Sequence, residues 1–198
     1  MSVSDSKTDL FENVLDFTER SKFREWLREH HSSERGCWIA LKRGRGPAEG
    51  RMRYLDAVEE ALCFGWIDTT VKTVGGTAMQ KFMPRSGRGR WSELNKERCR
   101  RLEKLGLMTD AGRAVLPDMS PDGFVMDAEI EEAFRRDPAA WENFRSFPDL
   151  YQRVRIDTVQ RDKSDRKAFE RRLEKLIERS RRGEMFGDWN DGGRLTEY

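Results

Sequence analysis

The stretch "ALCFGWID" at residues 61–68 marks the point where a helix ends and an extended segment begins. Upstream, apolar residues over 55–62 recur at helical spacing. Gly65 stands where a left-handed backbone closes a helix, a conformation that glycine adopts without strain. In the "WID" that follows, side chains alternate between faces, so Trp66 and Asp68 point to the same side. The stretch therefore predicts a helix that turns sharply into a strand.

Further strand signals surround this turn. Residues 66–74 and 77–84 flank a Gly-Gly pair and predict a hairpin. The run "CWIAL" at 37–41 is continuously apolar and contains a β-branched residue, which is typical of a buried strand. A short strand is also expected near Val14 and Leu15. All strand signals thus fall in the first half of the chain.

Helical signals dominate the second half. Thr18 is expected to cap an early helix, Ser92 a helix ending near Leu105, and Thr109 a short helix. Four more helices are predicted, at 127–136, 138–146, 149–160 and 165–182. Because strands and helices are segregated, we expect an α+β fold that is predominantly helical, with a small antiparallel sheet in the N-terminal half and a helical C-terminal half.

The segment "LPDMSPDG" at 116–123 is the best internal boundary, because it holds two prolines and a glycine. It separates an expected α+β lobe over 12–115 from a helical lobe over 122–183. The ends of the chain, residues 1–11 and 184–198, are polar or rich in glycine and aspartate, and we expect them to be flexible unless Phe186 and Trp189 dock on the body.

Composition excludes several functional classes. Charged residues make up 37% of the chain, yet the net charge is only +2, so a nucleic-acid role would need a local patch. Three separated cysteines and two adjacent histidines offer no disulfide framework and no metal-binding spacing. We therefore expect no metal and no cofactor. The N-terminus lacks an apolar signal region and no apolar run approaches the ~20 residues of a membrane span, which predicts a cytoplasmic protein.

The first candidate site lies on the predicted strand after the turn. Asp68, beside the Trp66 indole, could bind a cation or act as a general base. The alternative is that Trp66 packs in the core while Asp68 caps the turn or pairs with Lys72. Cys63 is a poor nucleophile candidate, because a helix C-terminus disfavours a thiolate, and we expect a buried structural cysteine there.

The second candidate is the basic segment 81–104, which holds nine basic and three acidic residues. Arg85 and Arg90 lie on a glycine-containing loop that leads into a helix N-terminus, where anions are favoured. Trp91 adds an indole for stacking. The alternative is a solvated basic loop with Trp91 folded onto the core. The basic stripe on the helix at 165–182 is interpreted as a solvated, salt-bridged face.

These segments together predict one composite cleft for a ligand. It would bring a carboxylate, several cations and two indoles to a shared hollow, with the side chains supplied by the two candidate segments. The residues expected to line it are Trp66, Asp68, Lys72, Arg85, Arg90, Trp91, Ser92 and Asn95.

Several motifs resemble those of the YdeI/OmpD-associated family, also called bacteriocin-protection proteins. The resemblance is strongest over about residues 17–113 and weaker in the C-terminal helices. It rests on "FREWLREHH" (23–31), "CWIALKR" (37–43), "EALCFGWID" (60–68), "FMPR" (82–85), "WSELN" (91–95), "GLMTDAG" (106–112), "DPAAWENF" (137–144) and "RRLEKLIE" (171–178). It implies a role in protection against bacteriocins and cationic antimicrobial peptides, with no established chemical activity or cofactor.

Three functions follow as hypotheses. The leading one is a cytoplasmic stress-resistance protein of the bacteriocin-protection type whose cleft binds a small anionic or zwitterionic ligand. The second is an enzyme that uses the same cleft, with Asp68 as general base and Arg85 as anion clamp. The third is a nucleic-acid binder that uses the basic segments 43–53 and 81–104.

Overall fold

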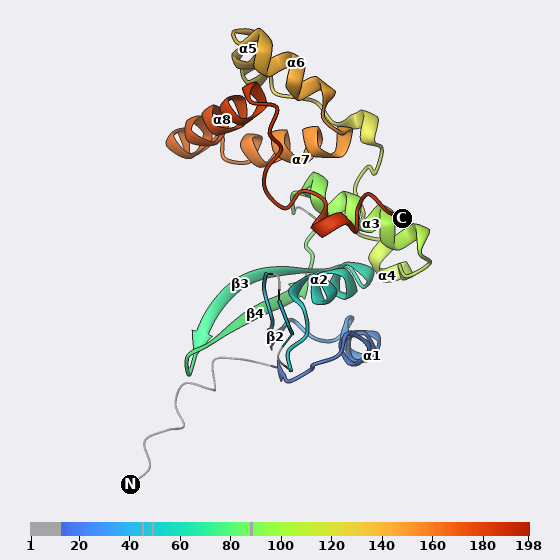
Figure 1. Ribbon diagram of the computed structural model, residues 1–198. Helices are drawn as coiled ribbons and strands as arrows, with labels where there is room; N and C mark the ends of the chain where they lie inside the picture. Colours follow the sequence, from blue (N-terminus) through green and yellow to red (C-terminus); the bar gives the residue numbers. More distant parts are fainter. Residues whose placement is uncertain (1–12, 45, 49, 88) are drawn as a thin grey trace. The chain divides into compact units, whose positions relative to one another are not determined.

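A computed structural model describes residues 13–44, 46–48, 50–87 and 89–198 (Figure 1). The predicted N-terminal tail, residues 1–11, lies outside the described residues. The chain divides into two compact units. The N-terminal unit runs through Gly89 and also includes Leu102–Pro117, and the C-terminal unit comprises Arg90–Arg101 and Asp118–Tyr198. Within the described residues, no helix is both long and apolar enough to span a bilayer.

The N-terminal unit contains a four-stranded sheet with the order β1-β2-β4-β3. The hairpin strands β3 (Trp66–Val74) and β4 (Thr77–Pro84) have the predicted bounds. Both β3 and β2 (Cys37–Ala40) pair antiparallel with β4. The exception to the expected antiparallel sheet is β1 (Val14–Leu15), which runs parallel to β2 because a helix connects the two strands.

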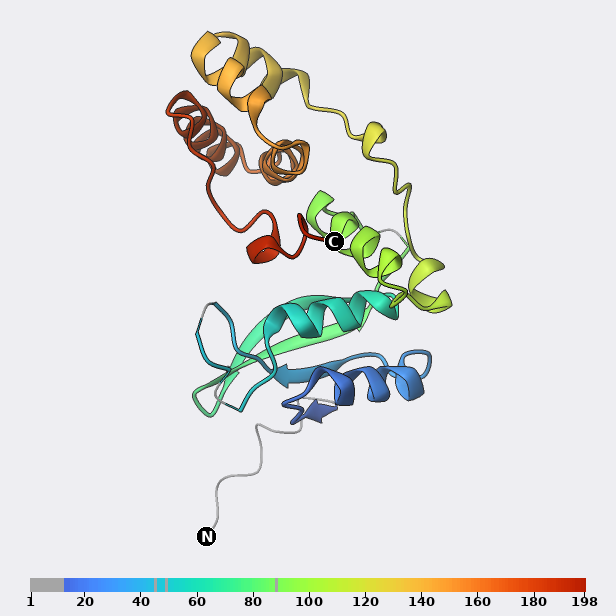
Figure 2. The ribbon, with the colours of Figure 1, turned by 45° about the vertical axis from the view of Figure 1, so that its right-hand side comes forward.

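Helices α1 (Arg20–His30) and α2 (Tyr54–Cys63) lie against the sheet (Figure 2). On β4, Phe82 packs against Phe23 of α1, with ring centroids 5.5 Å apart. Its register partner on β3 is Asp68, which is bonded to Tyr54 of α2. Because cross-strand partners share a face, both helices cover the same side of the sheet. Glu19, rather than Thr18, occupies the cap position of α1, and it forms no side-chain cap bond.

The turn that ends α2 has the predicted form. Gly65 has φ +74°, and its N–H donates to the carbonyl of Leu62. A Cβ at this position would lie 3.0 Å from the carbonyl oxygen of Ala111, in the short helix α4 (Asp110–Arg113). Thr109 caps α4 as predicted, and its hydroxyl also donates to the carbonyl of Cys63 at 2.6 Å. Glycine at the turn therefore permits close packing between the end of α2 and α4.

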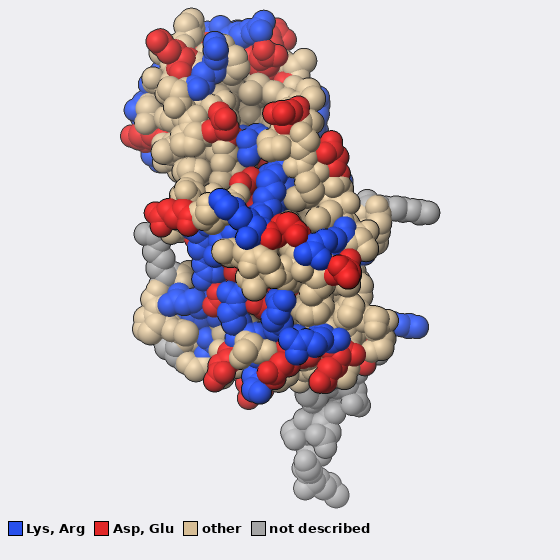
Figure 3. All heavy atoms as spheres, turned by 90° about the vertical axis from the view of Figure 1, so that its right-hand side faces the viewer, with Lys and Arg blue, Asp and Glu red and all other residues tan. Residues whose placement is uncertain are grey.

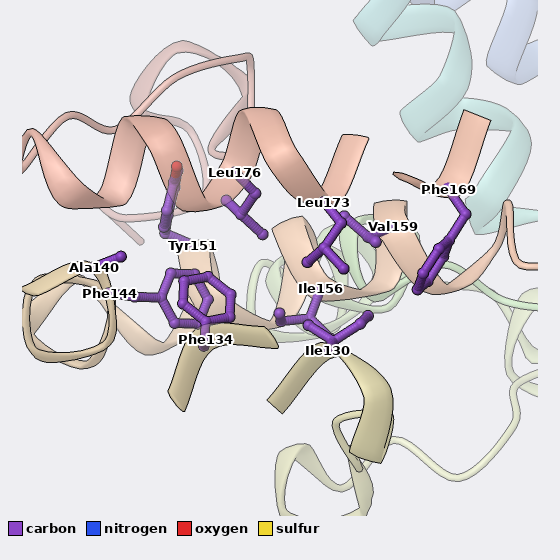
Figure 4. Close-up of a cluster of buried hydrophobic side chains, with 10 residues drawn as sticks. All are labelled: Ile130, Phe134, Ala140, Phe144, Tyr151, Ile156, Val159, Phe169, Leu173 and Leu176. Atoms are coloured by element: carbon purple, nitrogen blue, oxygen red, sulfur yellow. The ribbon is translucent and has the colours of Figure 1, made fainter. Parts of the chain in front are cut away.

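The C-terminal unit is helical, as expected. The four predicted helices form within one residue of their expected ends, and Asp137 caps the second of them through the N–H of Ala140. They pack around a core rich in aromatic residues (Figure 4). Their bounds are α5 (Ala128–Arg135), α6 (Pro138–Ser146), α7 (Asp149–Gln160) and α8 (Arg166–Arg181).

The C-terminal unit also includes most of α3 (Glu93–Lys104) and the segment after α8. In that segment Phe186 and Trp189 pack against the aromatic core. Asp191, only 4% exposed, accepts two hydrogen bonds from Arg98 of α3. The segment predicted to be flexible therefore has both apolar and charged anchors in the structure.

Candidate functional site

The predicted site residues of the N-terminal unit have separate surroundings. Trp66 is 1% exposed, and its indole Nε1 donates to the carbonyl of His31 at 3.1 Å. Its ring also meets Trp26 of α1 edge to face. Trp66 thus packs among core residues, as the alternative interpretation proposed.

Asp68 belongs to a polar cluster with Tyr54. The Tyr54 hydroxyl donates to Asp68 Oδ2 at 2.6 Å, and the Arg43 guanidinium lies 3.9 Å from the centre of the Tyr54 ring. Arg43 in turn donates to the side chain of Gln80, which is 2% exposed. The carboxylate that was predicted to pair with Lys72 or to act as a base is therefore hydrogen-bonded to a phenol.

Lys72 and Arg85 are directed elsewhere. The Lys72 ammonium lies 5.8 Å from the Trp38 ring, on the sheet face opposite Asp68. Arg85 is 8% exposed, and its backbone N–H donates to the carbonyl of Gly65.

The other predicted residues belong to the C-terminal unit. Ser92 caps α3 as expected, accepting a hydrogen bond from the backbone N–H of Asn95. The Asn95 side chain accepts from Arg98. Arg90 is exposed and Trp91 is half-buried. Because the eight predicted residues are divided between the two units, the composite cleft stays a prediction.

Cys63 has the properties of a structural residue. It is buried, and burial together with the charge of Glu60 raises the pKa of its thiol to about 11, against the opposing effect of Arg24. Such a thiol is protonated at neutral pH and is a poor nucleophile. Within the described residues, no group of three histidine, cysteine, aspartate or glutamate side chains could hold a metal ion.

A cavity that the sequence did not predict lies in the C-terminal unit, between α7, α8 and the segment after α8. Its volume is about 190 Å³, and we call it the basic cavity. Two apolar residues of its lining, Val159 and Leu176, come from α7 and α8. Three cations and no carboxylate line it. The lining residues are Arg155, Thr158, Val159, Arg172, Lys175, Leu176 and Phe186.

Arg155 is the electrostatically unusual residue of the basic cavity. Among the described residues, no carboxylate lies within ion-pairing distance of it, and its buried Nε–H has no hydrogen-bond acceptor. Its guanidinium lies 5.3 Å from the centre of the Phe186 ring. Burial lowers the pKa of Arg155; Tyr151 opposes this effect, repulsion from Arg161 and Arg172 adds to it, and Asp188 opposes it weakly. The positive charge is therefore poorly compensated.

The two other cations differ in how far they are neutralised. Arg172 pairs with Asp162 at 2.7 Å and donates to the carbonyl of Thr158. Lys175 lies 5.1 Å from the Phe186 ring, and no carboxylate among the described residues pairs with it. An anion entering the cavity would thus meet the half-buried Arg155 and the exposed Lys175, neither paired with a carboxylate of the described residues, and one cation that is already paired.

Other hollows on this unit lack this composition. A groove of about 500 Å³ along α8 is lined by three glutamates, two of which, Glu170 and Glu178, pair with arginines of the same helix. Another of about 440 Å³ lies beside Trp141 of α6. On the face drawn in Figure 3, lysine and arginine lie among aspartate and glutamate.

The sequence contained one signal for the basic cavity. Arg155 stands inside the apolar series Val154, Ile156 and Val159, where a solvated charge is unexpected. The basic stripe that we interpreted as a solvated face supplies Lys175, whereas Arg172 of the same helix was not assigned to it. Docking of Phe186 on the body was left open, because its position depends on how the final segment returns to α7 and α8.

Comparison with known families matches each half of the chain separately. Residues 15–115, just over half of the chain, match the family described as Domain of unknown function (DUF8412). Residues 123–183 match the family described as Bacteriocin-protection, YdeI or OmpD-Associated. The predicted resemblance is thus confirmed, but its match lies in the C-terminal helices, whereas segment 17–113, where it was strongest, matches the other family. No curated protein and no solved structure matches the chain significantly.

Proposed function

The chain belongs to the DUF8412 family and carries a bacteriocin-protection, YdeI or OmpD-associated domain, and we propose that it is a cytoplasmic protection protein that binds a small anionic or zwitterionic ligand. The ligand site of this proposal is the basic cavity of the C-terminal unit. Six of the seven lining residues lie within the segment that matches the bacteriocin-protection family.

The observation that carries the proposal is the uncompensated charge of Arg155. Arg155 is half-buried, and a partly desolvated positive charge without a partner is unfavourable, so a bound anion would supply the missing opposite charge. Arginine suits this task because its planar donors match the geometry of carboxylate and phosphate groups. Lys175 adds a second positive charge at the same cavity.

A thermal-unfolding screen tests whether the protein binds anions. An anion at about ten times its dissociation constant should raise the free energy of unfolding by about 1.4 kcal/mol. The variant Arg155→Met should lose this stabilisation. Arg171→Met is the matched control, because Arg171 is an exposed α8 residue that does not line the cavity. Equal stabilisation of wild type and Arg155→Met by every anion would refute the assigned site.

A cellular assay tests the protective role. Wild-type protein and Arg171→Met should increase the survival of bacteriocin-treated cells, whereas Arg155→Met at equal abundance should not. Full protection by Arg155→Met would show that the protective role does not depend on the basic cavity. Fractionation of the same cells tests the cytoplasmic location.

The enzymatic and nucleic-acid hypotheses stay predictions. Asp68→Asn would abolish turnover if this residue were a general base. If the protein binds nucleic acid through the basic segments, Arg155→Met should leave the affinity unchanged, and the affinity should fall steeply as the salt concentration rises.

A further inference from the structure

The apolar side of the basic cavity restricts the kind of anion that it can hold. Val159, Leu176 and the ring of Phe186 form part of its lining. A fully hydrated inorganic ion would leave these apolar surfaces in contact with water, whereas an organic anion could bury an apolar group against them. The volume of about 190 Å³ is below the range typical of drug-sized ligands, which limits the occupant to a small molecule.

The polar side of the cavity disfavours a zwitterion. A ligand ammonium is best neutralised by a carboxylate, and the lining contains no carboxylate. The Thr158 hydroxyl already donates to the carbonyl of Val154, and the carbonyl of Thr158 accepts from Arg172. An ammonium group would also be repelled by the three lining cations.

Gly187 fixes how the Arg155 guanidinium is presented. A Cβ at this position would lie 2.5 Å from Arg155 Nη1, so the guanidinium packs directly against the glycine backbone. The Nε–H is covered by protein atoms and has no acceptor among the described residues, so the edge formed by the two Nη groups is what remains for a ligand. A guanidinium edge of this kind binds a carboxylate through its coplanar N–H groups.

We infer that the ligand of the basic cavity is a small organic carboxylate that carries an apolar group and no ammonium group. Its carboxylate meets Arg155 and Lys175, and its apolar group lies against Val159, Leu176 and Phe186. This inference rests on the proposed function. Of the two ligand types considered there, anionic and zwitterionic, it selects the anionic type.

Calorimetric titration of the full chain with three probes tests the inference. The probes are 3-phenylpropanoate, phenylalanine and inorganic phosphate; the first two differ by a single ammonium group. We expect 3-phenylpropanoate to bind at least ten times more tightly than either of the others. Equal or tighter binding of phenylalanine or phosphate would overturn the inference and leave anion binding intact. Absence of binding by all three probes, together with a negative anion screen, would refute the proposed function as well.

Two variants test whether the ligand carboxylate binds at Arg155. Arg155→Lys keeps the charge but loses the planar edge, and Gly187→Ala keeps the arginine but displaces its guanidinium. Each should weaken 3-phenylpropanoate binding at least tenfold, while Arg171→Met should leave it unchanged. Circular dichroism establishes that each variant is folded. Unchanged affinity in both folded variants would place the ligand elsewhere and overturn the inference.

Discussion

Two partly buried arginines, one in each unit, have opposite electrostatic surroundings. In the N-terminal unit, Arg24 donates to Glu60 at 2.7 Å and to the carbonyl of Leu107 at 2.8 Å. Burial alone would lower its pKa, but the hydrogen bond and charge of Glu60 raise it above the ordinary value. In the C-terminal unit, the pKa of Arg155 is lowered, mainly by burial. The first arginine is paired within its fold, whereas the second has no carboxylate partner among the described residues.

The largest effect is expected where the buried charges are paired. Glu60, which is 2% exposed, accepts hydrogen bonds from Arg20 and Arg24. Removing one member of a buried pair leaves the other uncompensated, so Glu60→Gln should lower the free energy of unfolding by about 3 kcal/mol. Urea unfolding measures this change. Glu131→Gln, which removes an exposed pair with Arg135, is the control and should cost about 0.5 kcal/mol or less.

A much smaller change is expected at Arg155. Arg155→Met removes contacts with Phe186 but also relieves an uncompensated charge, so the free energy of unfolding should change by less than about 1 kcal/mol. The same urea titration, without added anions, measures it. Destabilisation comparable to that of Glu60→Gln would make Arg155 a structural residue and remove the contrast between the units.

The smallest effect concerns pH dependence within the C-terminal unit. Burial raises the pKa of Asp157, an effect opposed by Arg161 and the Glu93 N–H. A raised carboxyl pKa gives stability that is present below the ordinary pKa and is lost as pH rises through the folded-state value. Asp157→Asn should therefore gain stability relative to wild type as pH rises above about 4.

Asp137 provides a control of opposite sign. Its pKa is lowered by the N–H of Ala140 and by Arg181, so its stabilisation is present above the ordinary pKa and is lost on acidification. Asp137→Asn should lose stability relative to wild type as pH rises. Parallel urea titrations over a pH series compare the two variants, and the same sign for both would contradict this assignment.

Local sequence rules predicted most of the fold. The apolar stripe that includes Phe169 and Leu173 predicted a helix over 165–182, and α8 spans Arg166–Arg181. The Gly-Gly turn predicted both hairpin strands with their observed bounds. These elements depend on periodicity and turn chemistry, which short stretches of sequence contain.

The candidate site depends on contacts that short stretches do not contain. Alternation correctly predicted the strand that carries Trp66 and Asp68, but their partners, His31 and Tyr54, come from helices that only the tertiary fold brings near. The basic cavity likewise needs α7 to lie beside α8. A charge pattern on one helix does not reveal which of its cations will face an apolar neighbour.

The central claim is that an anion binds Arg155 in the basic cavity. The most direct measurement follows the arginine Nε–H signals by nuclear magnetic resonance while 3-phenylpropanoate is added, with Arg155 assigned by its absence in Arg155→Met. We predict a saturable shift of the Arg155 signal and unchanged signals for Arg20 and Arg24, which are already paired. An unchanged Arg155 signal, or equal shifts across the exposed arginines, would contradict the account.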